Sequence, residues 1–560
     1  MPAFKENILL KRTNLIVALA QTVIFGYIQI AFDQRLGPIF WSLISIIILL
    51  FLDVKSCFFF VLTFSAVSVS VFQILDFFSF TIFSEFSSTI IWGLSCILTA
   101  IAFPLKREPI RKEVGVTAFI VSLPIAFLFS RNFEVRIAAF ITGWDHTGAH
   151  ASITRSLLSN NTFHYFPVDY VGSSPKLFHG IVAMYNFDSA SGFELMHFVQ
   201  LLDYFCVLFI VLAIVFLAKP FQNLSGYYLV PILVSSSIFI PFMIPWAIQM
   251  GFSTLLMATS LLLCGICCID KSSRNIKVLS SIFLIIAISH TWTPLILVAL
   301  FVSASSLRHE TVFRVRFFLP IIVMITFSSQ PPLSVIFSKG LVTTFGVGDL
   351  VFSSLFFWNL LALFFIILFT RTRARGWDPI WFATLGGLIS TLVIKLAVSL
   401  DPISFPYYSI KLLWVSNFLA IPLILNTLSR KMKSRPLGSS VAAMIFLVIN
   451  LFFGSMPYGA GSPYKVMFNP PEDLLWQARA SKIAVDSLSK QAVLYSSTGY
   501  DSRGAQVLNL NGIRTWDAFD GLGSSPKSIC EYLLENPETL VIQKQGKGLQ
   551  CKPINLIIVH

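Results

Sequence analysis

Residues 195–217 read LMHFVQLLDYFCVLFIVLAIVFL, 23 residues with one carboxylate, Asp203, and no Lys or Arg. About 20 predominantly apolar residues suffice to cross the hydrocarbon core of a bilayer as an α-helix. The rest of the chain has a similar character, because 56% of its 560 residues are hydrophobic and only 12% are charged. Soluble domains carry about a quarter charged residues. The composition therefore excludes a soluble enzyme and predicts a polytopic α-helical membrane protein.

Apolar runs of spanning or near-spanning length recur along the chain. They lie at about 14–32, 36–54, 56–76, 88–105, 114–130, 195–217, 226–246, 248–269, 276–290, 292–307, 315–329, 351–370, 379–399, 409–428 and 439–456. We expect about fifteen membrane spans from these runs, each bounded to within about 2–4 residues. A few runs are short enough to be re-entrant segments.

The basic residues cluster between these runs on alternate sides. With a cytoplasmic N-terminus, the inner loops carry 22 Lys and Arg residues, and the outer loops before residue 457 carry 6. An excess of positive charge on the cytoplasmic side is typical of membrane proteins. We therefore expect a multi-pass protein of the plasma membrane with a cytoplasmic N-terminus. The net charge of +13 then reflects topology, and no nucleic-acid partner is expected.

Two stretches escape the predicted spans, and both fall on the predicted outer face. They divide the chain into N-terminal transmembrane helices at 1–113, a transmembrane core at 114–456 and an exterior domain at 457–560. The core contains an outer loop at 131–194. The first apolar run has no cleavage site after it, so we interpret it as a retained helix.

The exterior stretch reads as a small α/β domain. Helices are predicted near 472–489 and 525–535, and strands at Ala492–Ser496, Thr539–Ile542 and Ile554–Val559. Cys530 and Cys551 are its only cysteines. A disulfide between them is plausible in an oxidising exterior compartment.

The outer loop at 131–194 is the first candidate active site. Five of the eight histidines lie in the loop and its exit into the next span: His146, His150, His164, His179 and His197. Titratable groups gathered at the membrane surface are what a site for a polar substrate requires.

The segment ITGWDHTGAHASITRSLL at 141–158 predicts a short helix along the membrane surface. Asp145 lies near its start and either caps the helix, where the dipole favours a carboxylate, or acts as a general base. Beside Trp144, a partly desolvated carboxylate could take a proton from a sugar hydroxyl. His146 and His150 share a helix face at i and i+4. With Asp145 they could hold a divalent metal, although no further ligand is evident.

Two further segments place histidines at ends of apolar runs. In SSPKLFHGIVAM at 173–184, His179 is either a polar residue at a helix start or a donor turned toward an anionic or sugar ligand. HTWTP at 290–294 joins two short apolar runs, which puts His290 and Trp292 at or just below the outer surface. Irregular backbone at that depth usually lines a cavity.

A cation lies inside an apolar helix in SFPYYSIKLLW at 404–414. Lys411 is about one turn in from the outer side. It either snorkels to the surface or binds a lipid phosphate, because a charge at that depth is costly. Lys395 has the same ambiguity, and Asp203 is either its counter-ion or a polar residue near the interface.

The exterior stretch at 498–521 mixes aromatic, charged and amide side chains in a loop-rich segment. This mixture suits a glycan, whose rings stack on aromatics while its hydroxyls form directional hydrogen bonds. Trp516 would be the platform. The alternative is a solvated surface with Trp516 buried in the core of the small domain.

These features together resemble the GT-C glycosyltransferases. The nearest similarity is to actinobacterial membrane glycosyltransferases, including arabinofuranosyltransferase-like members, in which a loop bearing Asp and His precedes a Pro-x-x-x-His segment. Here the loop carries Asp145 with His146 and His150, Pro175 is followed by His179, and the Tyr-Tyr-x-x-Lys pattern is Tyr407, Tyr408 and Lys411. The resemblance covers most of the chain from about 114 onward. Ser174 stands where a Tyr before the Pro is expected, and the acidic loop follows the fifth span rather than the first.

The resemblance implies an inverting glycosyltransferase of cell wall biogenesis. It would move a sugar from a polyprenyl-phosphate donor to a cell-envelope glycan or lipid acceptor on the outer face. The implied roles are general base for Asp145, phosphate binding for Lys411 with His179 or His290, and sugar or acceptor binding for Trp144, Trp292, Tyr407, Tyr408 and Trp516. No cofactor is implied beyond the divalent metal considered above.

Two other classes remain open from the sequence. A transporter or flippase of lipid-linked glycans also needs many spans and a cationic cavity, but it is expected to carry charges near the midplane and paired broken helices in two halves. The charges here crowd the outer face, which favours the enzyme. A membrane-bound sensor or assembly subunit would use the exterior domain as a recognition module.

Overall fold

The computed structural model describes a large part of the chain, and every structural statement below concerns that part. The described residues are 15–28, 36–103, 115, 117–119, 130–141, 150–161, 163, 177–186, 191–218, 247–248, 251–270, 272–306, 360–368, 370, 378–398, 407–432, 470–496, 499–500, 502–515, 526–546, 549 and 551–559. Four of the predicted spans lie wholly or largely outside these ranges: 114–130, 226–246, 315–329 and 439–456.

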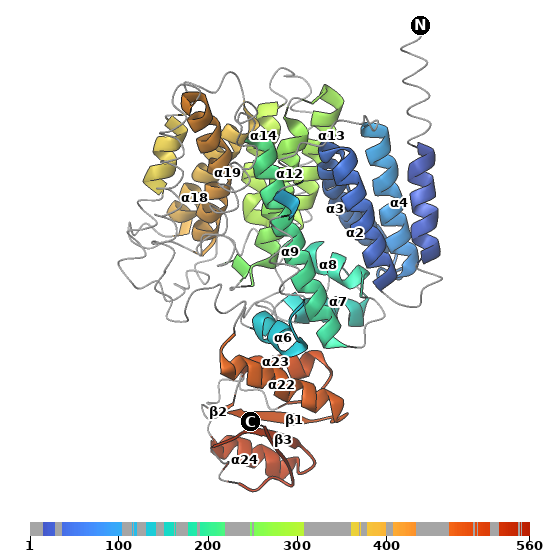
Figure 1. Ribbon diagram of the computed structural model, residues 1–560, viewed down its shortest axis with the longest axis vertical. Coiled ribbons are helices and arrows are strands. Elements are labelled where there is room, and N and C mark those ends of the chain that lie inside the picture. The colour runs from blue at the N-terminus through green and yellow to red at the C-terminus, as the bar shows by residue number, and fades with distance from the viewer. Residues whose placement is uncertain are drawn as a thin grey trace.

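Apolar helices make up the larger part of the molecule (Figure 1). Within the described ranges, five are long and apolar enough to cross a membrane: α3 (Val54–Phe77), α4 (Glu85–Ala102), α9 (Gly192–Leu217), α18 (Pro379–Val398) and α19 (Tyr407–Met432). Shorter helices run beside them: Leu15–Ile28, α2 (Leu36–Leu52), α12 (Ser253–Ile269), α13 (Arg274–Ser289), η3 (Thr293–Leu295) and α14 (Ile296–Ser306). The chain is thus a multi-pass membrane protein.

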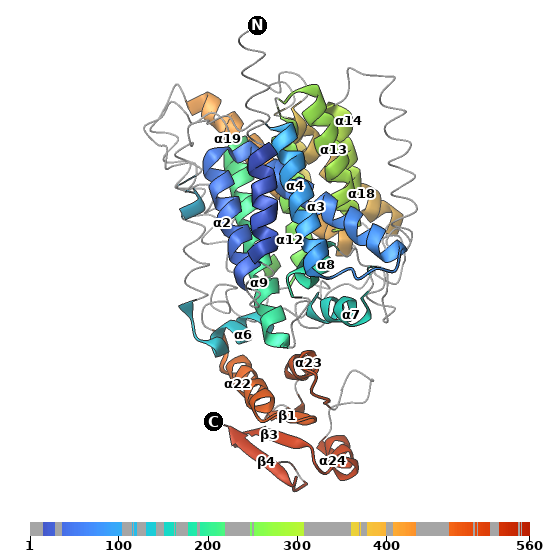
Figure 2. The same cartoon turned by 90° about the vertical axis from the view of Figure 1, so that its right-hand side faces the viewer.

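Local sequence explains where the first helices begin. Asp53 caps α3 by accepting hydrogen bonds from the Lys55 backbone N–H at 3.0 Å and the Ser56 hydroxyl at 2.6 Å. Ser84 and Ser87 form a reciprocal capping box at the start of α4. Such caps satisfy backbone donors that have no partner inside the helix. Asp53 alone separates α2 from α3, and the two helices contact each other. Figure 2 shows α2, α3 and α4 on the side of the bundle that is turned toward the viewer.

The core is centred on α9, which packs against α12 and α19. Close approach within the bundle depends on small residues: a Cβ on Gly265 of α12 would lie 2.9 Å from the Leu284 side chain of α13. Small residues at helix contacts are the usual means of close packing in membranes. α18 and α19 pair with each other beside α14.

Contacts between distant segments identify the two ends of the bundle. At one end, Lys55 Nζ donates to the carbonyl of Asp270 at 2.8 Å. Both residues fall on the side that the charge pattern predicts to be inside. At the other end, Glu134 binds Arg479, and the backbone N–H of Gly192 donates to Asn511 Oδ1 at 3.0 Å. The predicted outer loop and exterior domain therefore meet at the same end of the bundle.

Three short helices lie in the predicted outer loop: α6 (Phe133–Ile141), α7 (Ser152–Asn160) and α8 (Leu177–Met184). They lie between the bundle and the small domain (Figure 1). The predicted surface helix at 141–158 corresponds in part to α7, whose Ile153 and Leu157 are buried. The residues that would join α7 to α6 fall outside the described ranges.

The small domain has the predicted α/β character. Its elements are α22 (Glu472–Asp486), β1 (Ala492–Ser496), β2 (Gly499–Tyr500), α23 (Ser502–Leu510), α24 (Pro526–Glu535), β3 (Leu540–Lys544) and β4 (Asn555–Val559). The sheet order is β2-β1-β3-β4, with β1, β3 and β4 parallel and β2 antiparallel to β1. α22 packs on one face of the sheet and α24 on the other.

Two details of the small domain bear on the sequence predictions. The expected disulfide between Cys530 and Cys551 is confirmed. The segment 498–521 is less irregular than expected, because Ser502–Leu510 forms the helix α23, with Val507 and Leu508 buried. Helix α23 and the short strand β2 are the elements that the sequence pattern did not reveal.

Candidate functional site

Two of the predicted histidines meet directly at the end of the bundle that is predicted to face outward. His150, two residues before α7, and His179, in α8, lie with Nδ1 and Nε2 2.9 Å apart. His150 Nε2 lies 2.8 Å from the carbonyl oxygen of Gly251. His179 is fully buried and His150 is 7% exposed. The pair is thus removed from water and joins α8 to the turn before α12.

The protons of this pair follow from its partners. A carbonyl oxygen can only accept, so His150 Nε2 must carry a hydrogen and donate to Gly251. In a neutral imidazole the other nitrogen is then an acceptor. His179 Nε2 therefore donates to His150 Nδ1 when both rings are neutral. Both ring nitrogens of His150 are engaged, which does not fit a metal ligand.

Gly251 is suited to its place by its backbone. Its φ of 74° lies in the left-handed region, which glycine adopts without steric cost. Hydrogen bonds from Gly251 N to Ile248 O and from Phe252 N to Ala247 O close the turn. The turn directs the Gly251 carbonyl at His150 and starts α12 at Ser253. This glycine was not singled out from the sequence, where it precedes an apolar run.

Lys411 extends the same group of residues. It lies in the second turn of α19, is 6% exposed, and holds Nζ 3.5 Å from the centroid of the Phe252 ring. An ammonium over an aromatic face is attracted by the ring quadrupole. The side chain is buried, which does not fit simple snorkelling. His179, His150, Gly251, Phe252 and Lys411 therefore form one continuous set of contacts, called the histidine–lysine cluster below.

The predicted break at HTWTP is present and borders this cluster. α13 ends at Ser289, and a short 3₁₀ turn, η3, precedes α14. The carbonyl of His290 accepts from the backbone N–H of Leu177 at 2.8 Å, two residues before His179. The His290 ring lies 3.3 Å, Nε2 to Nε2, from the side-chain amide of Gln73 in α3. His290 thus connects α8 with α3, a link the sequence did not suggest.

Aromatic rings lie near the start of α19. The ring centroids of Trp292 and Tyr408 are 6.2 Å apart at an interplanar angle of 43°. Trp292 is buried, and Tyr408 lies three residues before Lys411. The predicted aromatic platform and the predicted phosphate cation are thus neighbours.

A buried carboxylate lies on the next element. Asp203 of α9 is 1% exposed and accepts from the Ser253 hydroxyl of α12 at 2.9 Å. Ser253 follows Phe252 in the chain. This hydrogen bond therefore places the Asp203 carboxylate next to the histidine–lysine cluster.

Several predicted site residues lie outside the described ranges: Trp144, Asp145, His146, Pro175 and Trp516. Tyr407 begins α19, and nothing is described of its side chain. Over the described ranges, no three His, Cys, Asp or Glu residues gather in a way that could hold a metal ion. The roles predicted for the residues outside those ranges stay predictions.

The small domain is held against α6 at the end of the bundle that is predicted to face outward. Arg479 Nε donates to Glu134 Oε2 at 2.8 Å, and Arg479 also lies 3.4 Å from Glu472. The hydrogen bond to Glu134 raises the pKa of Arg479 further above its ordinary value. Lys482 Nζ lies 5.3 Å from the centroid of the Phe133 ring. These contacts fix α22 on α6.

The described helices define the class, a multi-pass membrane protein with a small α/β domain at one end. Comparison with models of protein families, with characterised proteins and with solved structures gives no match. Function must therefore be inferred from the chemistry of the cluster.

Proposed function

We propose that the protein is a membrane glycosyltransferase that moves a sugar from a polyprenyl-phosphate donor to a cell-envelope glycan or lipid acceptor on the outer face, with inversion. One observation carries the proposal. Residues from four segments that are distant in the sequence meet at one end of the bundle, as the histidine–lysine cluster with Trp292 and Tyr408 beside it. Among these residues, the GT-C resemblance assigns Lys411 and His179 to binding of the donor phosphate, and Trp292 and Tyr408 to binding of the sugar or acceptor.

The proposed reaction needs few groups. The acceptor hydroxyl gives its proton to the carboxylate of Asp145, and its oxygen forms a bond to the anomeric carbon of the donor sugar. The bond between that carbon and the phosphate oxygen breaks, and the electron pair leaves with the polyprenyl phosphate. Attack from the face opposite the leaving group inverts the anomeric centre. General-base catalysis of this kind contributes roughly 10²–10⁴-fold.

The cluster supports the leaving-group side of this reaction. Developing charge on a phosphate is stabilised by fixed donors and cations in a site that excludes water. Lys411 supplies a buried positive charge, and the hydrogen bonds of His150 to His179 and Gly251 hold the surrounding segments in place. Trp292 and Tyr408 supply aromatic faces for a sugar ring. Asp145 is five residues from His150 in the chain, which makes it the nearest predicted base.

The test is transfer by the purified protein in nanodiscs, using polyprenyl-phosphate sugars and following release of polyprenyl phosphate. Lys411→Met keeps the apolar stem and removes the charge. A charge-assisted hydrogen bond is worth about 1.5–3 kcal/mol, so the donor KM should rise about 10- to 100-fold. Lys395→Met is the matched control, because Lys395 lies in the last turn of α18. Equal donor KM values in the two variants would show that Lys411 does not bind the donor. If no donor yields polyprenyl phosphate, the proposed glycosyltransferase activity is excluded.

A transporter of lipid-linked glycans is the second candidate, and Asp203 favours it. This carboxylate is buried in the middle of α9, where ionisable residues commonly serve transport. Proteoliposomes holding a fluorescent lipid-linked glycan separate the two functions. A transporter moves the intact lipid across the bilayer, whereas a transferase cleaves it without moving it.

A further inference from the structure

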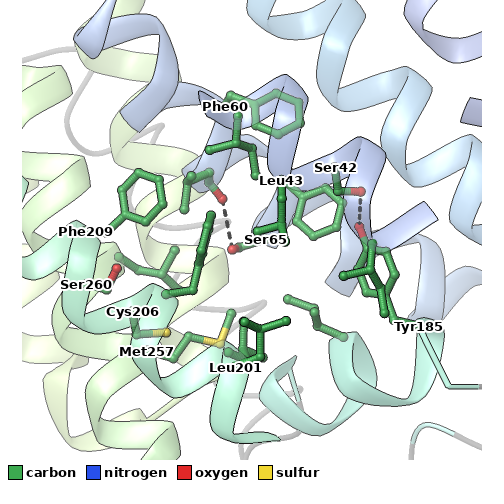
Figure 3. A pocket seen from close by; sticks show the side chains of 18 of the residues that line it. Ser42, Leu43, Phe60, Ser65, Tyr185, Leu201, Cys206, Phe209, Met257 and Ser260 are labelled. Carbon is green, nitrogen blue, oxygen red and sulfur yellow. Dashed lines mark hydrogen bonds between the residues drawn. The ribbon is translucent and has the colours of Figure 1, made fainter. Parts of the chain in front are cut away.

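An apolar pocket lies deeper in the bundle, between α2, α3, α9 and α12 (Figure 3). Its volume is about 110 Å³, and it is partly open. The walls carry hydrocarbon side chains such as Leu43, Phe60, Leu201, Phe209 and Met257. The pocket thus separates the N-terminal helices from the core helices α9 and α12.

Three of the four hydroxyls that line this pocket, those of Ser42, Ser65 and Tyr185, have hydrogen-bond partners in the protein. Ser42 and Tyr185 lie 2.9 Å apart, oxygen to oxygen, across one end, and Ser65 donates to the Val61 carbonyl at 2.9 Å (Figure 3). A buried water needs two to four polar partners. The lining therefore suits a hydrocarbon better than water.

The hollow continues on the other side of α2. A second pocket of about 130 Å³ lies between the helix Leu15–Ile28, α2 and α4, and it shares Ile46, Phe60 and Trp92 with the first. The side of α2 away from the pockets is exposed at Ile44 and Ile47. In a membrane protein such an apolar surface faces lipid. The two pockets are therefore one helix away from the bilayer.

We propose that the first pocket binds one acyl chain of a bilayer phospholipid, which fills the space between the N-terminal helices and the core. Protein interiors leave few voids larger than a water molecule, and an apolar chain restores the dispersion contacts that an open space would lack. Hydrocarbon chains are the apolar molecules present at this depth. The second pocket lies where such a chain would continue past Trp92.

The position of the pocket distinguishes a phospholipid from the proposed donor. On α8, Ile181 lines the pocket, and His179 belongs to the histidine–lysine cluster. Two residues are 200° apart around an α-helix at 3.6 residues per turn. The pocket and the cluster thus lie on opposite sides of α8. The inference does not rest on the proposed function, so either proposal can fail without the other.

The experiment is photolabelling in nanodiscs with a phospholipid that carries a diazirine in its acyl chain, with adducts mapped by mass spectrometry. Adducts are expected on Phe209 or Met257 as well as on the lipid-facing side of α2. Ser65→Phe on α3 and Ser260→Phe on α12 fill the pocket from two helices and should lower the pocket adducts severalfold. Ser65→Ala and Ser260→Ala keep the space and should label like the unchanged protein. Labelling at Ile44 and Ile47 is the internal control in all five proteins.

Three outcomes overturn the proposal. Pocket adducts are absent in the unchanged protein although α2 is labelled. Pocket adducts persist undiminished in a folded Phe variant. A polyprenyl-phosphate probe labels the pocket and the phospholipid probe does not. If both Phe variants fail to fold, labelling of the unchanged protein with the two probes still tests the first and the third outcome.

Discussion

His150 joins two segments of the candidate site because each of its ring nitrogens has a different partner. Nε2 donates to Gly251, so the neutral ring accepts from His179 at Nδ1. A substitution that keeps only one polar atom at this place breaks one of the two links. The geometry of the cluster therefore depends on the backbone of Gly251 as well as on the imidazoles.

Gly251→Ala should lower the free energy of unfolding by about 1–2 kcal/mol, the cost of a left-handed backbone in a residue with a Cβ. Thermal unfolding in nanodiscs measures the change. Gly115→Ala is the control, because an added Cβ there meets nothing within 4 Å and its φ is not left-handed. Equal melting temperatures for the two variants would mean that the turn relaxes freely.

Asp145→Asn tests the predicted base. Asn caps helices about as well as Asp, so a capping residue should tolerate the change. A general base should not, and turnover should fall by roughly 10²–10⁴-fold while the melting temperature stays constant. Full turnover in the Asn variant would leave Asp145 as a cap.

Some residues of the candidate site could be predicted from the sequence, and others could not. His150, His179, His290 and Lys411 stand out because polar groups are rare in apolar runs. Phe252 does not, because an aromatic residue at the start of a span is ordinary. Its contact with Lys411 depends on how α12 and α19 pack, which is a tertiary property.

At the scale of elements, the hydrophobic periodicity predicted most of what is described. Most of the fifteen apolar runs coincide wholly or in part with described helices, and β1 has the predicted bounds. α23 was missed because Gly504, Asn509 and Asn511 read as loop residues. A Cβ on Gly504 would lie 2.5 Å from the Leu494 side chain, so packing on β1, rather than helix propensity, selects this helix.

The contact between α6 and α22 can be tested by charge reversal. Glu134→Lys or Arg479→Glu replaces an attraction with a repulsion, and the double variant restores the pair in reverse. A partly exposed pair is worth up to about 1 kcal/mol, so each single variant should increase hydrogen exchange in α22 slightly. The double variant should return toward the unchanged protein. Additive effects would show that the pair does not couple the two helices.

At the scale of the molecule, the charge pattern and the contacts give one arrangement, with Lys55 and Asp270 at one end and the small domain at the other. The side of the membrane at which each end lies was predicted from the basic residues alone. Cysteine labelling checks it. The native cysteines are buried, half-buried or joined in the Cys530–Cys551 disulfide, so a surface cysteine gives a clear signal.

In intact cells, Asn160→Cys should react with an impermeant maleimide, and Arg274→Cys should react only after permeabilisation. Both positions are exposed, so a difference between them reports sidedness rather than burial. The reverse result would place the histidine–lysine cluster on the cytoplasmic side and exclude an outer-face reaction.

The attachment of the small domain also sets an order of assembly. Glu134 and Arg479 are 345 positions apart, and Gly192 and Asn511 are 319 apart. At about 5–20 residues per second of synthesis, Glu134 and Gly192 are made roughly 16–70 s before their partners. The membrane part must therefore be inserted and hold its shape through that interval without the small domain. Docking of the small domain onto α6 and α9 then completes that end of the bundle.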